Sequence, residues 1–502
     1  MDATDNPGTP GLAYLAQLPA LELCRDLYEG TFRMREAGEK YMPRFEMEEP
    51  ADYNARLTEA VLHNAFRRSV RGLTGMVFRK EPLLGDDVPD QIVADWENFD
   101  LAGRHGRVFW RDCFVDKLIA GHVGVFVDWH AVGDAMSQAE EEAMQARPYA
   151  VQIQKDQIIR WRAELRNGRA VLISFAYMES DTVPYGEFGE KLIYRVRQYD
   201  LVEGPRVNFR SWTRESDKEQ WDVETAGEIM GERCTRIPLV IDYAGRTGTL
   251  TSEPPLEDLA HLNRRHWSLT SDRDSLLHTS HTPVFTIIGE SKENGAKVKM
   301  GAHTGLVLEN SDASAQWTEA SGTALDQSGV EVENLEKRMA QHGLSMLESD
   351  TRAAETAASK RIDKTESDSQ LSSDASNTQD AIEEVLSLFA MWYGLPTGSN
   401  GLPAGGSCEV NKDYEDQPIP PEFIGFLQKL VEGSSLSVET MWEILVARGV
   451  LPETFDPEME RMLIEDDAGR ALQAMQQMRD AMGTPDPTQS DPNAPQPPQP
   501  TA

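Results

Sequence analysis

Four aspartates in the C-terminal half carry the chemistry that would matter most if this chain were an enzyme. Asp363, Asp368, Asp374 and Asp380 supply the carboxylates with which two-metal nucleases hold divalent cations. Their spacings of 5, 6 and 6 residues do not keep to one face of a helix. We therefore expect these aspartates to be solvated or to lie between subunits, and not to bind metal.

Other candidate sites are equally incomplete. His278 and His281 could place two imidazoles near each other on a helix, but no acid or cysteine stands at ligand spacing. The glycine-rich run Gly401–Gly406 lacks the Gly-Lys-Ser/Thr ending of a phosphate loop, and the chain has no Gly-x-Ser-x-Gly or His-Glu-x-x-His motif. The sequence therefore predicts no catalytic residues, no metal site and no cofactor, and we expect a protein that is not an enzyme.

Composition narrows the function classes further. The 502 residues carry a formal net charge of -35, which argues against simple electrostatic binding to nucleic acid but not against a protein that lets DNA pass. Hydrophobic residues make up only 39%, which favours an extended shape or much subunit interface. The four cysteines are widely spaced and read as reduced, incidental thiols. We expect no membrane span and no signal peptide, because no 18-residue apolar run and no basic, apolar N-terminal segment occur.

The first half of the chain predicts an α+β fold. Helical patterns cover 12–36 and, from Pro50, a run to about Phe78; another helix over 104–120 precedes a buried strand over 121–129. Short β-rich runs separated by turn signals follow, at 149–154, 169–177, 191–199, 205–212 and 237–243.

Basic residues gather in one place in this half. Arg67, Arg68 and Arg71 could form a nucleic-acid site, or a solvated face that pairs with neighbouring acids. The second interpretation is favoured over the first. His122, between Gly121 and Gly124, is expected to be a packed core histidine.

Two helices that carry a small β module form the most distinctive layout. We predict helices over 255–280 and 328–347, with strands and turns over 283–320 between them. The second helix has an apolar stripe at steps of 3, 4, 3 and 4 residues, formed by Val332, Leu335, Met339, His342 and Met346.

A long polar helix is expected after a short charged segment. The run from about Ser359 to Tyr393 ends at a Gly-Leu-Pro stop signal and has an ordinary core face only in its last third. Its first two-thirds contain six serines, so it is either solvated and partly disordered or packed against copies of itself through small side chains. Beyond it we expect a flexible loop over 398–406, helices over 421–432, 437–448 and 456–480, and a disordered Pro-rich tail from Gly483.

Several stretches in a fixed order resemble the portal proteins of tailed bacteriophages, in the family long catalogued as a domain of unknown function. They cover roughly residues 35–395 and comprise Tyr41-Met42-Pro43-Arg44-Phe45, Asp52-Tyr53, Arg56-Leu57, Asn64, 72–80, 120–128, Arg147-Pro148-Tyr149, 159–162, 255–259 and 355–361.

The resemblance implies a subunit of a ring of about twelve copies at one capsid vertex. It implies an α/β wing with the N-terminal tail (1–254), a stem of two helices (255–282 and 328–347) and a small β-rich clip (283–327). A tunnel loop (348–358), a long wing helix with its return (359–420), a helical crown (421–482) and the disordered tail (483–502) would complete the subunit.

The same resemblance implies a conduit for packaging and ejecting double-stranded DNA without sequence preference. Twelve copies would carry about -420 of formal charge, which keeps DNA from adhering. Channel residues would be Glu348, Asp350, Arg352, Glu355, Lys360 and Arg361. Lys292, Lys297 and Lys299 at the clip would meet an acidic partner or form a solvated hairpin tip.

The partners implied are further copies of the chain, the terminase large subunit, the major capsid and scaffolding proteins, and the head-tail adaptor. The chain would reside in the virion at the capsid vertex and in the host cytoplasm during assembly. Two alternatives remain: a scaffold-like, non-enzymatic interaction protein associated with the capsid, and a DNA-processing enzyme such as a nuclease.

Overall fold

The fold is taken from a computed structural model. It describes residues 6–129, 146–204, 206–216, 218, 220–229, 234–280, 284–288, 314–318, 323–343, 357–396, 403–412, 414, 421–433, 435–447, 450–451 and 455–481. The chain divides into two units, residues 1–414 and 415–502, and mixes helices with separate antiparallel sheets, as the α+β expectation required. In the described residues, no helix is both long and apolar enough to cross a bilayer.

Two of the expected N-terminal helices are each broken in the structure. Gly30, with φ of 97°, divides the first into α1 (Leu12–Glu29) and α2 (Thr31–Ala37), followed by the short helix η1 (Gly38–Lys40). The run from Pro50 is α3 (Pro50–Glu59) and α4 (Ala65–Val77), because the Asn64 side chain accepts a hydrogen bond from the backbone N–H of Arg67 and starts a new helix. The expectation of one helix to Phe78 was therefore wrong.

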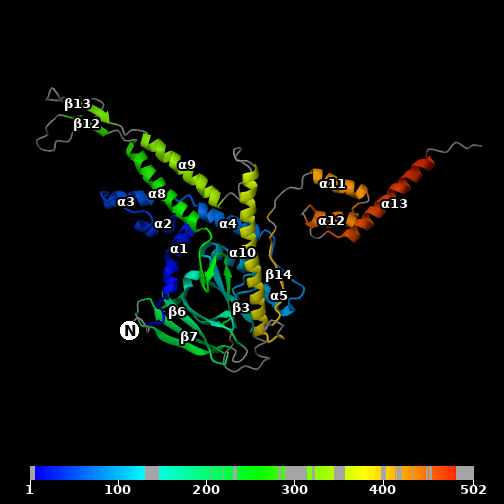
Figure 1. Cartoon of the computed structure of the whole chain (residues 1–502), viewed down its shortest axis with the longest axis horizontal. Helices are drawn as coiled ribbons and strands as arrows, with labels where there is room; N and C mark the ends of the chain where they lie inside the picture. The colour runs from blue at the N-terminus through cyan, green and yellow to red at the C-terminus, as the bar shows by residue number, and fades with distance from the viewer. Residues whose placement is uncertain are drawn as a thin grey trace, which may run out of the picture. The chain divides into compact units, whose positions relative to one another are not determined.

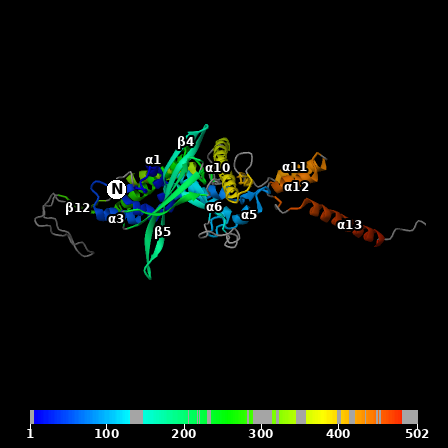
Figure 2. The same cartoon turned by 90° about the horizontal axis from the view of Figure 1, so that it is seen from below.

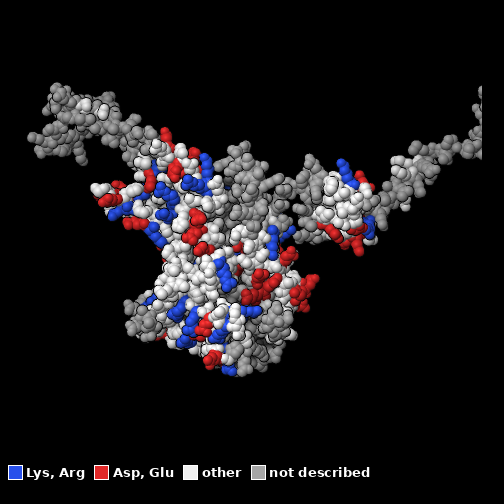
Figure 3. Space-filling view, in the orientation of Figure 1, with Lys and Arg blue, Asp and Glu red and all other residues white. Residues whose placement is uncertain are grey.

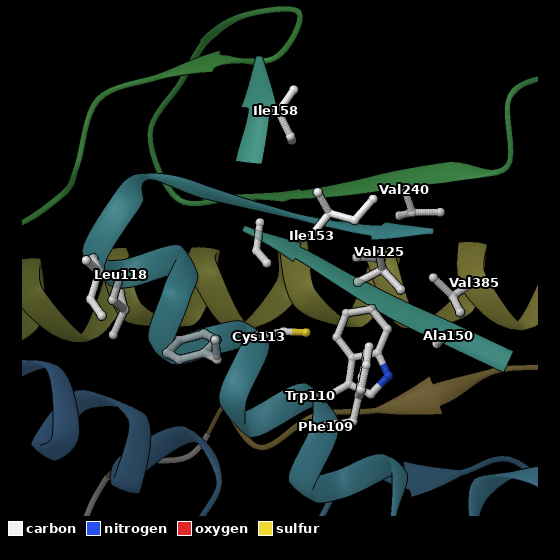
Figure 4. Packing of buried hydrophobic residues seen from close by; sticks show 14 of the residues in the cluster. Phe109, Trp110, Cys113, Leu118, Val125, Ala150, Ile153, Ile158, Val240 and Val385 are labelled. Atoms are coloured by element: carbon white, nitrogen blue, oxygen red, sulfur yellow. The ribbon is translucent and has the colours of Figure 1, made fainter. Parts of the chain in front are cut away.

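A three-stranded sheet forms the centre of the first unit. Its order is β3-β2-β9, from β3 (Pro148–Gln154), β2 (His122–Trp129) and β9 (Leu239–Tyr243), all antiparallel. Figure 4 shows α6 (Gly106–Ala120) against these strands, with Phe109, Trp110 and Cys113 buried, and with Val385 of the long helix α10 (Ala357–Trp392) nearby. The short helix α5 (Asp90–Trp96) precedes α6 and also contacts α10.

A second sheet of five strands packs on the first through aromatic rings. It is a meander in sequence order, from β4 (Ile158–Arg166), β5 (Arg169–Tyr185), β6 (Gly189–Val202), β7 (Arg206–Glu215) and β8 (Asp222–Ile229). Phe126 of β2 and Tyr199 of β6 lie 4.5 Å apart between ring centroids. The sequence predicted β5, β6 and β7 but not the two edge strands β4 and β8. The one-turn helix η2 (Lys155–Gln157) joins the two sheets.

The two stem-like helices are present with their β module. They are α8 (Glu257–Ser280) and α9 (Thr323–Gly343), and between them the strands β12 (Val284–Ile288) and β13 (Ser314–Thr318) pair antiparallel. Helix α9 begins five residues before the expected start at position 328, and Gly329 lies within it without interrupting the helix. Figure 1 shows α8 and α9 side by side, and they are in direct contact. Of the strands and turns expected over 283–320, residues 289–313 lie outside the described residues.

The long helix α10 (Ala357–Trp392) agrees with the expected run over 359–393 and contacts all three strands of the central sheet. The chain then returns through β14 (Cys408–Glu409), which pairs with β1 (Leu83–Leu84). The loop before β14 is packed rather than flexible from Pro403 onward. A Cβ on Gly405 would lie 2.2 Å from the backbone carbon of Leu386, and the Ser407 hydroxyl donates to Asp87 at 2.7 Å. A two-strand ribbon of β10 (Arg246–Gly248) and β11 (Thr251–Ser252) precedes α8.

The second unit consists of helices close to those expected. They are α11 (Pro421–Glu432), α12 (Val438–Ala447) and α13 (Pro457–Ala481). The N-terminus of α13 is capped, because the Asp456 carboxylate accepts the backbone N–H of Glu458 at 2.9 Å.

Candidate functional site

Helices α8 and α9 run antiparallel with a fixed register. Contacts recur at steps of seven residues in opposite directions. Gly329 lies beside the Arg273 guanidinium, His266 Nε2 is 3.3 Å from Glu336, and a Cβ on Gly343 would lie 2.6 Å from Leu259. Seven residues are close to two helical turns, so the contacts share one seam.

The apolar stripe of α9 covers this seam only in part. Val332, Leu335 and Met339 are buried as predicted, but His342 is exposed. Gly343 takes its place at the contact with α4, where a Cβ would lie 2.2 Å from the Ser69 hydroxyl. Met346 lies outside the described residues.

Polar side chains fasten α8 to the N-terminal helices. The buried Asn263 accepts the backbone N–H of Phe66 at 3.0 Å and donates to the carbonyl of His63 at 2.9 Å. Its neighbour His266 is buried as well, which lowers its pKa, and the imidazole lies 5.5 Å from the His63 ring. The amide oxygen thus accepts a backbone N–H that has no partner within the first turn of α4.

The polar centre of α8 contacts helix α3 through an arginine. Arg56 on α3 makes a bidentate ion pair with Glu48 at 2.8 Å and reaches Asp272 at 3.0 Å. Burial raises the pKa of Asp272, against the effect of Arg56. The pair of α8 and α9 is therefore held to α3 and α4 by directed polar contacts, which specify its direction more sharply than apolar packing does.

A second fastening point holds the long helix α10 to the central sheet. Lys117, fully buried on α6, donates to Asp242 at 2.8 Å, to the carbonyl of Asp374 at 2.7 Å and to the Thr378 hydroxyl at 2.5 Å. The Thr378 hydroxyl donates to the other oxygen of Asp242 at 2.7 Å. Burial raises the pKa of Asp242, and it raises the pKa of Asp374 to about 6. One ammonium therefore joins α6, β9 and α10.

This network corrects two expectations. Asp374 was expected to be solvated or inter-subunit, but it is buried, because the helix face that it shares with Leu371, Ala375 and Thr378 packs inside the subunit. The core contact of α10 therefore begins near Leu371 and is not confined to its last third. Asp380 is exposed. Within the described residues no cluster of His, Cys, Asp or Glu could hold a metal ion.

Most residues assigned to the channel and the clip lie outside the described residues. These are Glu348, Asp350, Arg352 and Glu355 of the expected tunnel loop and Lys292, Lys297 and Lys299 of the expected clip; His281 is also among them. Lys360 and Arg361 fall in the first turns of α10, and His278 is exposed at the end of α8.

The arginines of α4 do not act together. Arg67 donates to the carbonyl of Tyr28 and stacks on its ring at 5.6 Å, whereas Arg68 and Arg71 are exposed. Figure 3 shows acidic and basic side chains intermixed over the helices α2, α3 and α8, and a concentration of acidic ones over α5.

His122 is a packed core histidine, as expected. Its Nδ1 lies 2.7 Å from the Ser252 hydroxyl, and burial with the nearby Lys155 lowers its pKa to about 3. Lys155 donates to the carbonyls of Ala120 and Ser252, both at 2.8 Å.

The buried lysines are the site features that sequence reasoning missed. Lys117 follows Cys113 and Phe114 at helical spacing, so it stands on the apolar stripe of its helix. A lysine at such a position signals a buried ammonium that needs an acidic partner, and Asp242 in an apolar strand is the corresponding signal.

The chain was compared with protein families, with curated proteins and with solved structures. The model of a family described as "Domain of unknown function (DUF4055)" matches residues 255–393, which span α8 to α10. The search of curated proteins found no match. Among solved structures, the chain is similar to "Neck of empty GTA particle computed with C6 symmetry" (11% identity, 76% of this chain and 89% of that chain, TM-score 0.40). It is also similar to "Virion of native gene transfer agent (GTA) particle" (12% identity, 86% and 98%, TM-score 0.38). Similarity at this level assigns no function.

Proposed function

We propose that the chain is a portal subunit of a phage-like particle. Copies of it would form a ring, of about twelve subunits, at one capsid vertex. The ring would conduct double-stranded DNA during packaging and ejection and would bind the terminase, then the tail adaptor. It would contact the capsid and scaffolding proteins, and it would occur in the virion and, during assembly, in the host cytoplasm.

The observation that carries this proposal is the arrangement of α8, β12, β13 and α9. Two antiparallel helices in fixed register carry an antiparallel strand pair at one end. Asn263 ties α8 to α4 near the other end of the pair, and Arg56 ties the middle of α8 to α3. A strut that holds a small β module away from a larger body suits a stem and clip, and the sequence motifs resemble the portal family in the same order.

The charge of the chain supports a passive conduit. The net charge of -35 per chain opposes adhesion of DNA, because each lysine–phosphate contact would add affinity that translocation must overcome. Glu348, Asp350 and Glu355 would repel the duplex, whereas Arg352, Lys360 and Arg361 would make transient phosphate contacts. Lys292, Lys297 and Lys299 would face an acidic partner at the clip.

Electron microscopy of the purified protein, with its mass from light scattering, tests the proposal. Twelve chains of 56.1 kDa give a particle of about 670 kDa with an axial channel wide enough for a duplex. A chain that stays monomeric at high concentration and with its capsid partners would instead favour the scaffold-like interaction protein. Metal-dependent DNA cleavage would favour the nuclease.

A further inference from the structure

The hairpin of β5 and β6 extends beyond the sheet to which it belongs. The two strands pair as far as Tyr185 and Gly189, but pairing of β7 with β6 ends at Ile193 and pairing of β4 with β5 ends at Tyr177. The Ser216 N–H still donates to the carbonyl of Leu192 at 3.1 Å, so residues 183–191 form a two-stranded arm that projects about 13 Å, at roughly 3.3 Å per residue. A two-stranded ribbon is only marginally stable in water by itself, so the arm is a surface that a partner would stabilise.

The tip of the arm presents an aromatic ring between carboxylates. Phe188 is 91% exposed, and Glu187 and Glu190 beside it are exposed as well. The Tyr185 ring, unlike that of Phe188, has a neighbour within the chain. The Lys191 ammonium lies 5.3 Å from the Tyr185 ring and also forms an ion pair with Glu215 at 2.7 Å. The base of the arm is thus fixed by contacts within the chain, whereas Phe188 at its tip is exposed and accessible to another molecule.

The opposite end of the same sheet carries the complementary charge. Arg166 and Arg169 face each other across the β4–β5 turn, and Leu165 next to them is 78% exposed. Like charges directly opposite each other destabilise a strand pair unless an anion approaches. Glu164 meets Arg166 at 3.3 Å, which leaves the turn with a net positive charge.

The two ends cannot meet within one chain. Leu165 pairs with Ala170, and the arm tip follows Tyr185, so about fifteen residues of strand, or roughly 50 Å, separate them. Figure 2 shows the two ends of this sheet, near the labels β4 and β5, pointing in opposite directions. A contact between unlike ends of two copies is heterologous, and repetition of such a contact closes a ring when the rotation allows it.

We propose that the arm tip of one copy docks on the β4–β5 turn of the next copy around the ring. Phe188 packs on Leu165, while Glu187 and Glu190 pair with Arg166 and Arg169. This contact rests on the proposed ring, and it names the surfaces that join neighbouring subunits in the wing.

Cysteine cross-linking of the full-length protein tests the contact directly. All four native cysteines are buried, so they contribute little background. A mixture of Phe188→Cys and Leu165→Cys chains should give disulfide-linked dimers under oxidation, and neither variant alone should. A chain with both substitutions should give a ladder that ends at the closed ring. The matched control is Met47→Cys, which is 92% exposed elsewhere and should not link to Phe188→Cys.

Charge exchange adds a second readout. Reversing Glu187 and Glu190 to lysine should lower the initial cross-linking rate roughly fivefold at low salt, as expected for two exposed ion pairs. Pairing those chains with chains that carry Arg166→Glu and Arg169→Glu should restore the rate. The effect should vanish above about 0.5 M salt, where exposed charges are screened.

The outcomes separate the two proposals. Rings that form without a link between positions 188 and 165 would overturn the arm contact and leave the portal function in place. A link from position 188 to a capsid protein would likewise overturn it. A protein that forms no ring under any condition would overturn both.

Discussion

Replacing Lys117 with methionine should detach the long helix α10 from the central sheet. The buried ammonium donates to Asp242, to the backbone of Asp374 and to Thr378, so its removal leaves buried acceptors without their cation. Removing one partner of a buried ion pair typically costs about 3–5 kcal/mol. We expect a loss of stability of that size at pH 7.5, and faster hydrogen exchange in α10 before the first unit unfolds globally.

The loss of stability should be smaller at acidic pH. Burial already raises the pKa of Asp242, and loss of Lys117 raises it further. A carboxyl whose folded pKa exceeds its unfolded value stabilises the fold below the unfolded pKa, and this stabilisation disappears as pH rises through the folded pKa. The Lys117→Met variant should therefore approach the wild type as pH falls from 7.5 toward 5.

A matched control uses another cation that ties α10 to its surroundings. Arg236 pairs with Glu384 at 2.6 Å, but both side chains are partly exposed. Arg236→Met should cost less than about 1 kcal/mol. Urea unfolding followed by circular dichroism, with hydrogen exchange of α10 peptides, measures both variants. Equal costs for Lys117→Met and Arg236→Met, or unchanged exchange in α10, would refute the reasoning.

Three further substitutions test the same framework. Asp374→Asn should stabilise the protein above pH 6 by up to about 2–3 kcal/mol, because the pKa near 6 means that ionisation of Asp374 opposes folding; urea midpoints from pH 4 to 8 should converge with the wild type in acid. Gly405→Ala should cost about 1–3 kcal/mol, because its Cβ would collide with the backbone of Leu386, whereas Gly75→Ala, which meets nothing, should not lower the thermal midpoint. Asn263→Ala should cost about 1–3 kcal/mol by leaving the N–H of Phe66 buried and unpaired, and exchange at that amide should rise; an unchanged rate would contradict the fastening of α8 to α4.

The elements that the sequence predicted are those with a recognisable apolar pattern or a clear boundary. Helices α8 and α10 and strands β2 and β6 lie close to their expected ranges, because each has an apolar run, an apolar face or a start or stop signal that marks it. Strand β8 was missed because nearly all its residues are exposed and it includes Ala226 and Gly227, so it lacks a buried apolar face; pairing with β7, and not burial, defines it. The break before Ala65 depends on a single cap at Asn64, which a continuous apolar pattern conceals.

The candidate site was predicted less well than the fold, for a physical reason. The position of Asp374 depends on Lys117 and Asp242, which lie far from it in the chain, so no local spacing reveals that it is buried. Gly405 looked like part of a flexible loop because glycine permits many conformations. In the structure the same absence of a side chain allows the backbone to approach Leu386 closely.

The seven-residue register of α8 and α9 has a mechanical consequence. Sliding one helix by a single turn, about 5.4 Å, would separate His266 from Glu336 and withdraw Gly343 from Leu259 at the same time. Gly343 tolerates close approach only at its present position, where Ser69 also fills the space. Because the two helices cannot slide past each other, a force applied at the strands β12 and β13 would move α8 and α9 together as one rigid pair. That movement would be transmitted to α3 and α4, which the pair contacts.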